Sequence, residues 1–119
     1  FSGGVDSSLI FSNARKINKN IAAITADFGE GDDAKLRSLS LAEALKHENH
    51  LIREISNNDV EDSLKLISEI CESPFDDTSI IPSNIVFESV KRSGYSVYLT
   101  GDGADELFFG YSKVFGQMF

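Results

Sequence analysis

Short apolar runs alternate with longer segments of helical periodicity along this chain of 119 residues. The apolar runs are residues 21–26, 50–55 and 95–100, each about the length of one β-strand. Helical spacing of apolar residues marks residues 6–18, 33–47, 57–73 and 82–93. Such alternation is typical of a parallel sheet with helices packed on its faces. We therefore predict an α/β protein with a doubly wound parallel sheet, and a ligand site at the carboxyl ends of its strands.

The two ends of the chain carry incomplete elements. Phe1 has the place of the last residue of a further strand, and residues 105–119 are apolar with helical periodicity. We therefore expect residues 1–119 to form part of one domain whose sheet is incomplete at both ends. We expect Leu107, Phe108 and Phe109 to lie in the core. The apolar tail beyond them is expected to promote self-association into an oligomer.

Charge and composition argue against several classes of protein. The net charge is −8, so no nucleic-acid partner is expected, because phosphate contacts need clustered Lys and Arg. No apolar run approaches the roughly 20 residues of a membrane span, so no membrane association is expected. Cys71 is the single cysteine, which fits a reducing, cytoplasmic setting. We expect Cys71 to lie in the core, and His47 and His50 to be ordinary surface residues.

The first glycine-rich motif lies at the start of the first expected helix. Its residues are Ser2, Gly3, Gly4, Val5, Asp6, Ser7 and Ser8. The two glycines permit a tight turn and a close approach of the backbone to an anion. The helix that follows presents unpaired N–H groups and the positive end of its dipole, and the three serines add hydroxyl donors. Asp6 repels phosphate, but it can hold Mg²⁺ that bridges to phosphate oxygens. The alternative is a plain strand-to-helix turn with a Ser or Asp cap.

The second motif follows the apolar run at residues 95–100. Its residues are Gly101, Asp102, Gly103, Ala104, Asp105 and Glu106. Carboxylates this close together repel one another unless a cation lies among them, which points to a divalent metal ion. The alternative is an acidic cluster that stabilises the next helix through its dipole. That alternative accounts for Asp105 and Glu106, but it does not explain why glycines flank Asp102.

The two motifs, with residues 74–83 between them, resemble the synthetase domain of the asparagine synthetase family. The first motif resembles the pyrophosphate loop, or PP-loop, of the N-type ATP pyrophosphatases. Residues 101–111 are similar to the asparagine synthetase branch alone, and residues 74–83 resemble the segment that precedes them there. The order and separation agree, so the resemblance covers essentially the whole chain. It implies an adenine nucleotide alpha hydrolase-like fold, and the family's glutaminase domain has no counterpart in residues 1–119.

The resemblance implies a reaction with ATP and Mg²⁺ as cofactors and with aspartate and ammonia as partners. The side-chain carboxylate of aspartate attacks the α-phosphorus of ATP, and Mg-pyrophosphate leaves. Ammonia, which full-length members derive from glutamine, then attacks the β-aspartyl adenylate and yields asparagine and AMP. Metal ions and preorganised N–H donors suit this chemistry, because negative charge spreads over the departing pyrophosphate.

The resemblance also implies roles for individual residues of the two motifs and of the segment after the second apolar run. The residues implied to bind ATP and pyrophosphate are Ser2, Gly3, Gly4, Asp6, Ser7, Ser8, Phe28, Gly29 and Gly101. Asp6 and Asp105 are implied to bind Mg²⁺.

Further roles follow from the same match. Asp102 is implied to be catalytic, near the adenylate and the attacking ammonia. A catalytic lysine is expected beyond Tyr111, where Lys113 is the only candidate. Thr78 and Ser79 are implied to lie near the substrate aspartate.

Three alternative functions share parts of the pattern. Another adenylate-forming amide ligase, β-lactam-forming or peptide-cyclising, would carry both motifs and bind a different acid. A sulfur-transfer or tRNA-modifying relative would share the first loop, but the lack of paired cysteines and of a basic surface argues against it. An inactive nucleotide-binding module is the third alternative, and the intact Asp6 and Asp105 argue against it.

Overall fold

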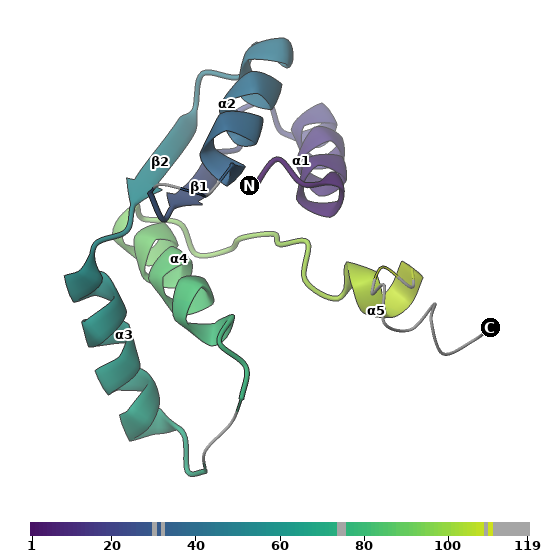
Figure 1. Ribbon diagram of the computed structural model, residues 1–119. Helices are drawn as coiled ribbons and strands as arrows, with labels where there is room; N and C mark the ends of the chain where they lie inside the picture. Colours follow the sequence, from purple (N-terminus) through teal and green to yellow (C-terminus); the bar gives the residue numbers. More distant parts are fainter. Residues whose placement is uncertain (30, 32, 74–75, 109, 111–119) are drawn as a thin grey trace.

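The computed structural model describes residues 1–29, 31, 33–73, 76–108 and 110 (Figure 1). Its elements are α1 (Val5–Ile17), β1 (Ala23–Asp27), α2 (Ala34–Ala44), β2 (His50–Glu54), α3 (Asn57–Ile70), α4 (Ile80–Arg92) and α5 (Ala104–Phe108). Within these described ranges, no helix is long and apolar enough to cross a membrane.

Strands β1 and β2 pair in parallel, with Ala23 opposite His50 and Asp27 opposite Glu54. Helix α2 connects them, so the three elements form a βαβ unit of the kind that parallel strands require. Alternating burial along β1 shows that one side of the strand faces the core. The mixed α/β class is therefore confirmed, and the larger doubly wound sheet stays a prediction.

The prediction of a strand at residues 95–100 is wrong, because these residues form a connecting segment without regular secondary structure between α4 and α5 (Figure 1). A strand is defined by hydrogen bonds to a neighbour, and the only ladder among the described residues joins β1 to β2. The side chains of Val97 and Leu99 are 78% and 63% exposed. Apolar composition alone therefore does not make this segment a strand.

Phe1 lies beside the edge of β1 that does not pair with β2. The amide of Ala23 donates to the Asn49 carbonyl on the β2 side, so the backbone groups of the next residue, Ile24, point to the opposite edge. There the Ile24 carbonyl accepts a hydrogen bond of 2.5 Å from the Phe1 amino nitrogen. The Thr25 hydroxyl also donates to the Phe1 carbonyl. These contacts place the start of the glycine-rich loop against the sheet.

A cluster of rings joins α1 to the sheet and overturns the prediction that both histidines are ordinary surface residues. The buried Phe11 ring lies 4.6 Å from the Phe1 ring and 4.8 Å from that of His47, centroid to centroid. His47 is itself only 9% exposed. The half-buried His50 stands edge-on to Phe1, with its Nε2 2.8 Å from the Thr25 hydroxyl. Burial lowers the pKa of His50.

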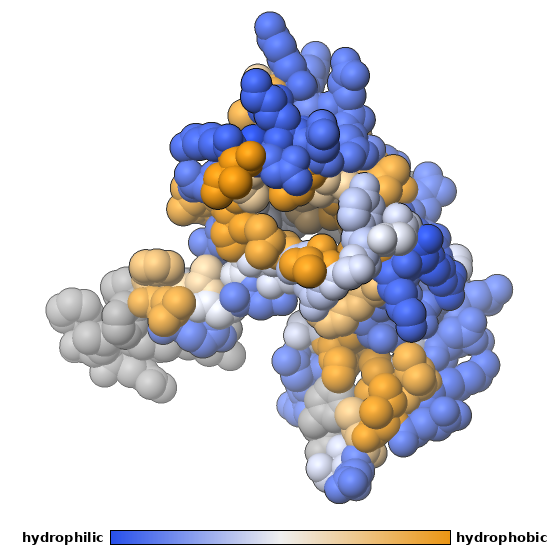
Figure 2. Space-filling view, turned by 180° about the vertical axis from the view of Figure 1, so that it is seen from behind, coloured by the Kyte–Doolittle hydropathy of each residue, from blue (hydrophilic) through white to orange (hydrophobic). Residues whose placement is uncertain are grey.

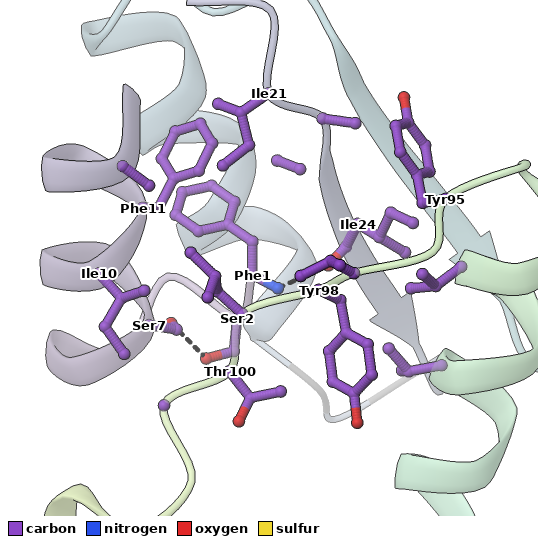
Figure 3. A pocket seen from close by; sticks show the side chains of 18 of the residues that line it. Phe1, Ser2, Ser7, Ile10, Phe11, Ile21, Ile24, Tyr95, Tyr98 and Thr100 are labelled. Atoms are coloured by element: carbon purple, nitrogen blue, oxygen red, sulfur yellow. Dashed lines mark hydrogen bonds between the residues drawn. The ribbon is translucent and has the colours of Figure 1, made fainter. Parts of the chain in front are cut away.

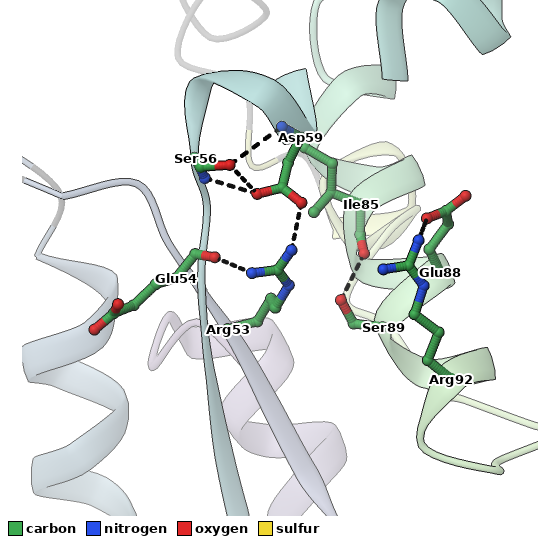
Figure 4. Close-up of polar contacts among 8 residues, drawn as sticks. All are labelled: Arg53, Glu54, Ser56, Asp59, Ile85, Glu88, Ser89 and Arg92. Carbon is green, nitrogen blue, oxygen red and sulfur yellow. Dashed lines mark hydrogen bonds and ion pairs between the residues drawn. The ribbon is translucent and has the colours of Figure 1, made fainter. Parts of the chain in front are cut away.

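A capping box starts α3 (Figure 4). The Ser56 hydroxyl accepts the Asp59 N–H, and the Asp59 carboxylate accepts the Ser56 N–H at 2.8 Å. Arg53 on β2 donates to the same carboxylate. Hydrogen bonds from Ser56, together with the Arg53 charge, lower the pKa of Asp59. These contacts couple the end of β2 to the first turn of α3.

Helices α3 and α4 pack against each other through Ile67, Ile85 and the buried Ser63, which accepts a 3.0 Å hydrogen bond from the Asn84 amide. Helix α3 ends at Ile70, so Cys71 is its half-buried C-cap and does not lie in the core as predicted. The backbone at Cys71 is extended, so the helix and its buried face end before this residue. Apolar side chains remain on the surface of the α3–α4 pair (Figure 2).

The prediction that residues 107–109 lie in the core is wrong for Leu107 and Phe108, which are 73% and 79% exposed. Helix α5 has five residues and lies apart from the sheet (Figure 1). No described element therefore covers these two side chains. Phe109 and the apolar tail at residues 111–119 lie outside the described residues.

Candidate functional site

The first glycine-rich motif forms the loop that leads into α1, as predicted. Gly4 is the N-cap residue of that helix, with an extended backbone. The Ser2 and Ser7 hydroxyl oxygens lie 3.1 Å apart, and Ser7 donates to the Gly4 carbonyl at 3.3 Å (Figure 3). Both hydroxyls therefore gather at the N-terminus of α1, beside its unpaired N–H groups. The Ser8 hydroxyl oxygen is buried, with no hydrogen-bond partner among the described residues.

Gly3 brings this loop against α2. Its φ of +71° belongs to the left-handed region that favours glycine. A β-carbon at this position would lie 2.6 Å from the Arg37 Cβ and 2.7 Å from the Ser38 backbone nitrogen. Only a residue without a side chain allows so close an approach. The backbone of the loop at Gly3 therefore packs directly on α2 at Arg37 and Ser38.

Gly101 brings the second motif against the first. A β-carbon on Gly101 would lie 3.1 Å from the Ser7 backbone nitrogen and 3.2 Å from the Asp6 Cβ. The next residue, Asp102, is exposed, and its N–H donates to the Thr100 hydroxyl at 3.1 Å. The structure thus places the two glycine-rich motifs, far apart in sequence, side by side.

A pocket of about 570 Å³ extends from this junction between α1, β1, α4 and residues 95–102 (Figure 3). Its polar end is formed by Ser2, Ser7, Thr100, Gly101 and Asp102. Its interior is mostly apolar, with side chains that include Phe1, Phe11, Ile24, Val86, Val90, Tyr95 and Tyr98. A volume of this size falls within the range of about 300–1,000 Å³ that small-molecule sites occupy.

The two carboxylates implied to bind Mg²⁺ each lie in the first turn of a helix. Asp6 is exposed in the first turn of α1, and Asp105 is half-buried in the first turn of α5. Among the residues that the structure describes, no three His, Cys, Asp or Glu side chains group closely enough to hold a metal ion. The assignment of Mg²⁺ to Asp6 and Asp105 therefore stays a prediction.

An ion pair with a buried carboxylate at the carboxyl end of β1 was not predicted from the sequence. Asp27 is only 7% exposed. Its carboxylate accepts a hydrogen bond of 2.6 Å from the Lys35 ammonium and one of 3.0 Å from the Gly29 N–H. Hydrogen bonds from Lys35 and Gly29 hold the pKa of Asp27 below its usual range, and the carboxylate raises the pKa of Lys35. The pair fixes the turn that carries Phe28 and Gly29, which are both exposed. An acidic residue at the end of an apolar run, with a lysine in the next helix, was the available signal.

The remaining expected site residues lie away from this junction or outside the described residues. Thr78 and Ser79 are exposed in the turn before α4 and do not line the pocket, whereas Pro82 and Ser83 do. Lys113 lies outside the described residues. The roles of these three expected residues stay predictions.

A βαβ unit, with a glycine-rich loop that leads into a helix beside the sheet, places the protein in the mixed α/β class. Within that class, the chain belongs to the asparagine synthase family, whose family match covers residues 1–118. This confirms the family resemblance.

Among its relatives, the chain is 34% identical over 116 residues to "Asparagine synthetase (glutamine-hydrolyzing) 1" of Bacillus subtilis strain 168. It is 30% identical over 112 residues to a Mycobacterium tuberculosis H37Rv protein that bears the provisional name asparagine synthetase (glutamine-hydrolyzing). Each match covers 93% of this chain and 17% of the relative. The chain thus spans about a sixth of the length of these relatives. No solved structure matches the chain.

Proposed function

We propose that this chain supplies the ATP-binding part of an enzyme that converts aspartate to asparagine. In this proposal β-aspartyl-AMP is the intermediate, and AMP and pyrophosphate are released. The observation that best supports the proposal is the contact of Gly101 with the Asp6–Ser7 backbone, because it brings together two motifs that would each form only part of a nucleotide site. Membership of the asparagine synthase family supports asparagine synthesis as the activity. A reducing, cytoplasmic setting stays part of the proposal.

The PP-loop would hold the pyrophosphate part of ATP. The N–H groups of the first turn of α1 and the Ser2 and Ser7 hydroxyls are preorganised donors at one place. The close fit of Gly3 against α2 favours this role, since it keeps the loop backbone from moving when a charged ligand arrives. Gly101, Phe28 and Gly29 would contact the rest of the nucleotide.

The donor set also suits a magnesium ion that bridges to phosphate. Mg²⁺ in such sites takes one or two protein carboxylates and fills its other positions with phosphate oxygens and water. Asp6 and Asp105, one from each motif, would be those carboxylates. When bound, the ion would neutralise the charge that develops on the departing pyrophosphate.

The acid-activating step would use Asp102 together with Thr78, Ser79 and Lys113. Asp102 is exposed at the polar end of the pocket, where it can meet the adenylate and the incoming ammonia. Thr78 and Ser79 would bind aspartate, and Lys113 would assist adenylation. No side-chain nucleophile is needed, because the substrate carboxylate attacks phosphorus directly.

The experiment that tests this function is the exchange of labelled pyrophosphate into ATP, with and without aspartate. It should be made on the longest natural protein that contains this segment, with Asp6→Asn as the inactive control. Aspartate-dependent exchange supports the proposal. Exchange with a different acid would assign the chain to another amide ligase of the family. No exchange with any acid, in a folded protein, would indicate an inactive nucleotide-binding module.

A further inference from the structure

Arg37 in α2 lies directly against Gly3 of the glycine-rich loop. The β-carbon that Gly3 lacks would lie 2.6 Å from the Arg37 Cβ and 2.7 Å from the Arg37 carbonyl carbon. The Arg37 side chain therefore starts at the surface where α2 contacts the loop. A guanidinium can reach several ångströms from its own Cβ, so the Arg37 head group can approach a ligand held by the loop.

The direction of the Arg37 side chain also favours the loop. Helical side chains lean toward the N-terminus of their helix, and the Arg37 Nη1 lies 4.0 Å from an Asp33 carboxylate oxygen one turn earlier. That end of α2 follows the carboxyl end of β1. Phe1 runs beside β1 and leads into the loop at Gly3, which packs on α2 at Arg37. A side chain that leans toward the N-terminus of α2 therefore leans toward the carboxyl end of β1.

Arg37 is free to move to a ligand, whereas Lys35 is held. The side chains of Arg37 and Asp33 are 52% and 77% exposed, and an exposed ion pair at 4.0 Å restrains its partners weakly. The Lys35 ammonium lies 2.6 Å from a carboxylate that is 9% exposed. A planar guanidinium is always charged and binds phosphate through two parallel hydrogen bonds.

We propose that Arg37 is a further phosphate-binding residue of this site. On binding, its guanidinium turns from Asp33 toward the loop and donates to oxygens of the β- and γ-phosphates of ATP, which leave as pyrophosphate. The inference rests on the proposed function, which assigns the loop to these phosphates. It also supplies a side-chain cation to an anion site in a chain of net charge −8.

The test compares Arg37→Gln with Arg92→Gln in the protein used for the exchange assay. Arg92 is a matched control, because it is an exposed helical arginine with an acidic partner, Glu88, four positions earlier (Figure 4). Titration calorimetry would measure the affinities for Mg-ATP, Mg-pyrophosphate and AMP. Arg37→Gln should lower the first two about tenfold or more, as expected for lost charge-assisted hydrogen bonds. AMP affinity should stay within about twofold, and Arg92→Gln should change none of the three.

For a second variant we predict a change of pyrophosphate affinity in the opposite direction. Asp33→Asn removes the carboxylate that competes for Arg37, so pyrophosphate affinity should rise about two- to threefold. In the Arg37→Gln background this gain should disappear, because the two residues act through the same contact. A gain that persists there would show that simple charge repulsion by Asp33 is the cause, and it would overturn the inference.

The inference would also be overturned if Arg37→Gln and the parent protein bound pyrophosphate equally well. An equal loss of affinity for all three ligands would overturn it too, and so would a parent protein that binds no pyrophosphate. The proposed function can fail separately. If pyrophosphate binding depends on Arg37 but no acid promotes exchange, the phosphate site stands and the asparagine-forming activity does not.

Discussion

Gly101 lies so close to Ser7 that a β-carbon on the glycine would be 3.1 Å from the serine backbone nitrogen. The contact sets the second motif directly against the first turn of the helix that begins in the PP-loop. A larger residue at position 101 would require the two motifs to move apart by a few tenths of an ångström. This backbone contact therefore helps to set the arrangement of the proposed nucleotide site.

Gly101→Ala should weaken ATP binding on the order of tenfold, because a misplacement of about 1 Å can cost about a hundredfold and the shift needed here is smaller. The added methyl group would lie 3.2 Å from the Asp6 Cβ, so α1 or the second motif must shift. Calorimetric titration with Mg-ATP would measure the change. Ser96→Ala, in the same connecting segment, should bind as the parent does. Unchanged affinity in Gly101→Ala would show that the contact does not position the site.

Gly3→Ala should destabilise the fold by about 2–4 kcal/mol, as the sum of a left-handed non-glycine residue and an overpacked contact. The methyl group would overlap the Arg37 Cβ at 2.6 Å. Gly4→Ala is the control, since its φ is −72° and the nearest atom to its new carbon is the Ser2 hydroxyl oxygen at 3.3 Å. Its effect should be under about 1 kcal/mol. Urea denaturation of both variants checks this, and similar losses would contradict it.

Asp6→Asn should abolish the Mg²⁺ dependence of nucleotide binding while leaving the fold intact, because Asp6 is exposed in the first turn of α1. The loss of Mg-ATP affinity should be about tenfold or more, since even groups that only support metal ligands have effects of that size. Titrations with and without Mg²⁺ would measure it, with the exposed Asp62→Asn as the control. If Asp6→Asn binds Mg-ATP normally, the metal assignment is wrong.

The ion pair of Asp27 and Lys35 predicts a pH dependence of stability. Folding lowers the pKa of Asp27, mainly through the hydrogen bond from Lys35. Its contribution is therefore complete above the unfolded carboxyl pKa of about 4 and is lost as the pH falls through the lower folded value. Asp27→Asn should be less stable than the parent at pH 7, and the difference should shrink as the pH falls below about 4.

Urea denaturation between pH 2.5 and 7 would test the Asp27 prediction, at acidities that span the titration of an ordinary carboxyl group near about 4. Asp59 and Asp77 also have lowered pKa values and remain in the variant, so part of the acid sensitivity should persist. Asp62→Asn, which removes an exposed carboxylate, should follow the parent curve. A difference between Asp27→Asn and the parent that is independent of pH would contradict the prediction.

Ser56→Ala should lower the free energy of unfolding by about 1 kcal/mol, the usual effect of removing an N-cap side chain. The variant leaves the Asp59 N–H without the hydroxyl that accepts its hydrogen bond. Ser68→Ala is a matched control on the same helix, where the hydroxyl only donates to the Lys65 carbonyl at an exposed position. Chemical denaturation should separate the two variants, and equal stabilities would argue against the capping box.

The local elements of this fold could be predicted from the sequence. Apolar spacing located the cores of helices α1 to α4, and apolar runs located β1 and β2, because these elements depend on residues near one another in the chain. The two glycine-rich motifs were also recognisable, and with them the family. The spacing of glycine, serine and aspartate in these motifs reflects a local backbone requirement, which the sequence alone can show.

The contacts between distant segments were decided only by the tertiary structure. Residues 95–100 have the composition of a strand, but they form no hydrogen-bonded ladder with another strand among the described residues. Strand pairing depends on a neighbouring strand, which the composition of one segment does not reveal. His47 is buried because the Phe11 ring packs on it, and Asp27 is buried because Lys35 in α2 neutralises it. The approach of Gly101 to Ser7 likewise arises from how the chain returns to α1. Local hydrogen bonding and periodicity determined the elements, and non-local packing decided which of their side chains meet.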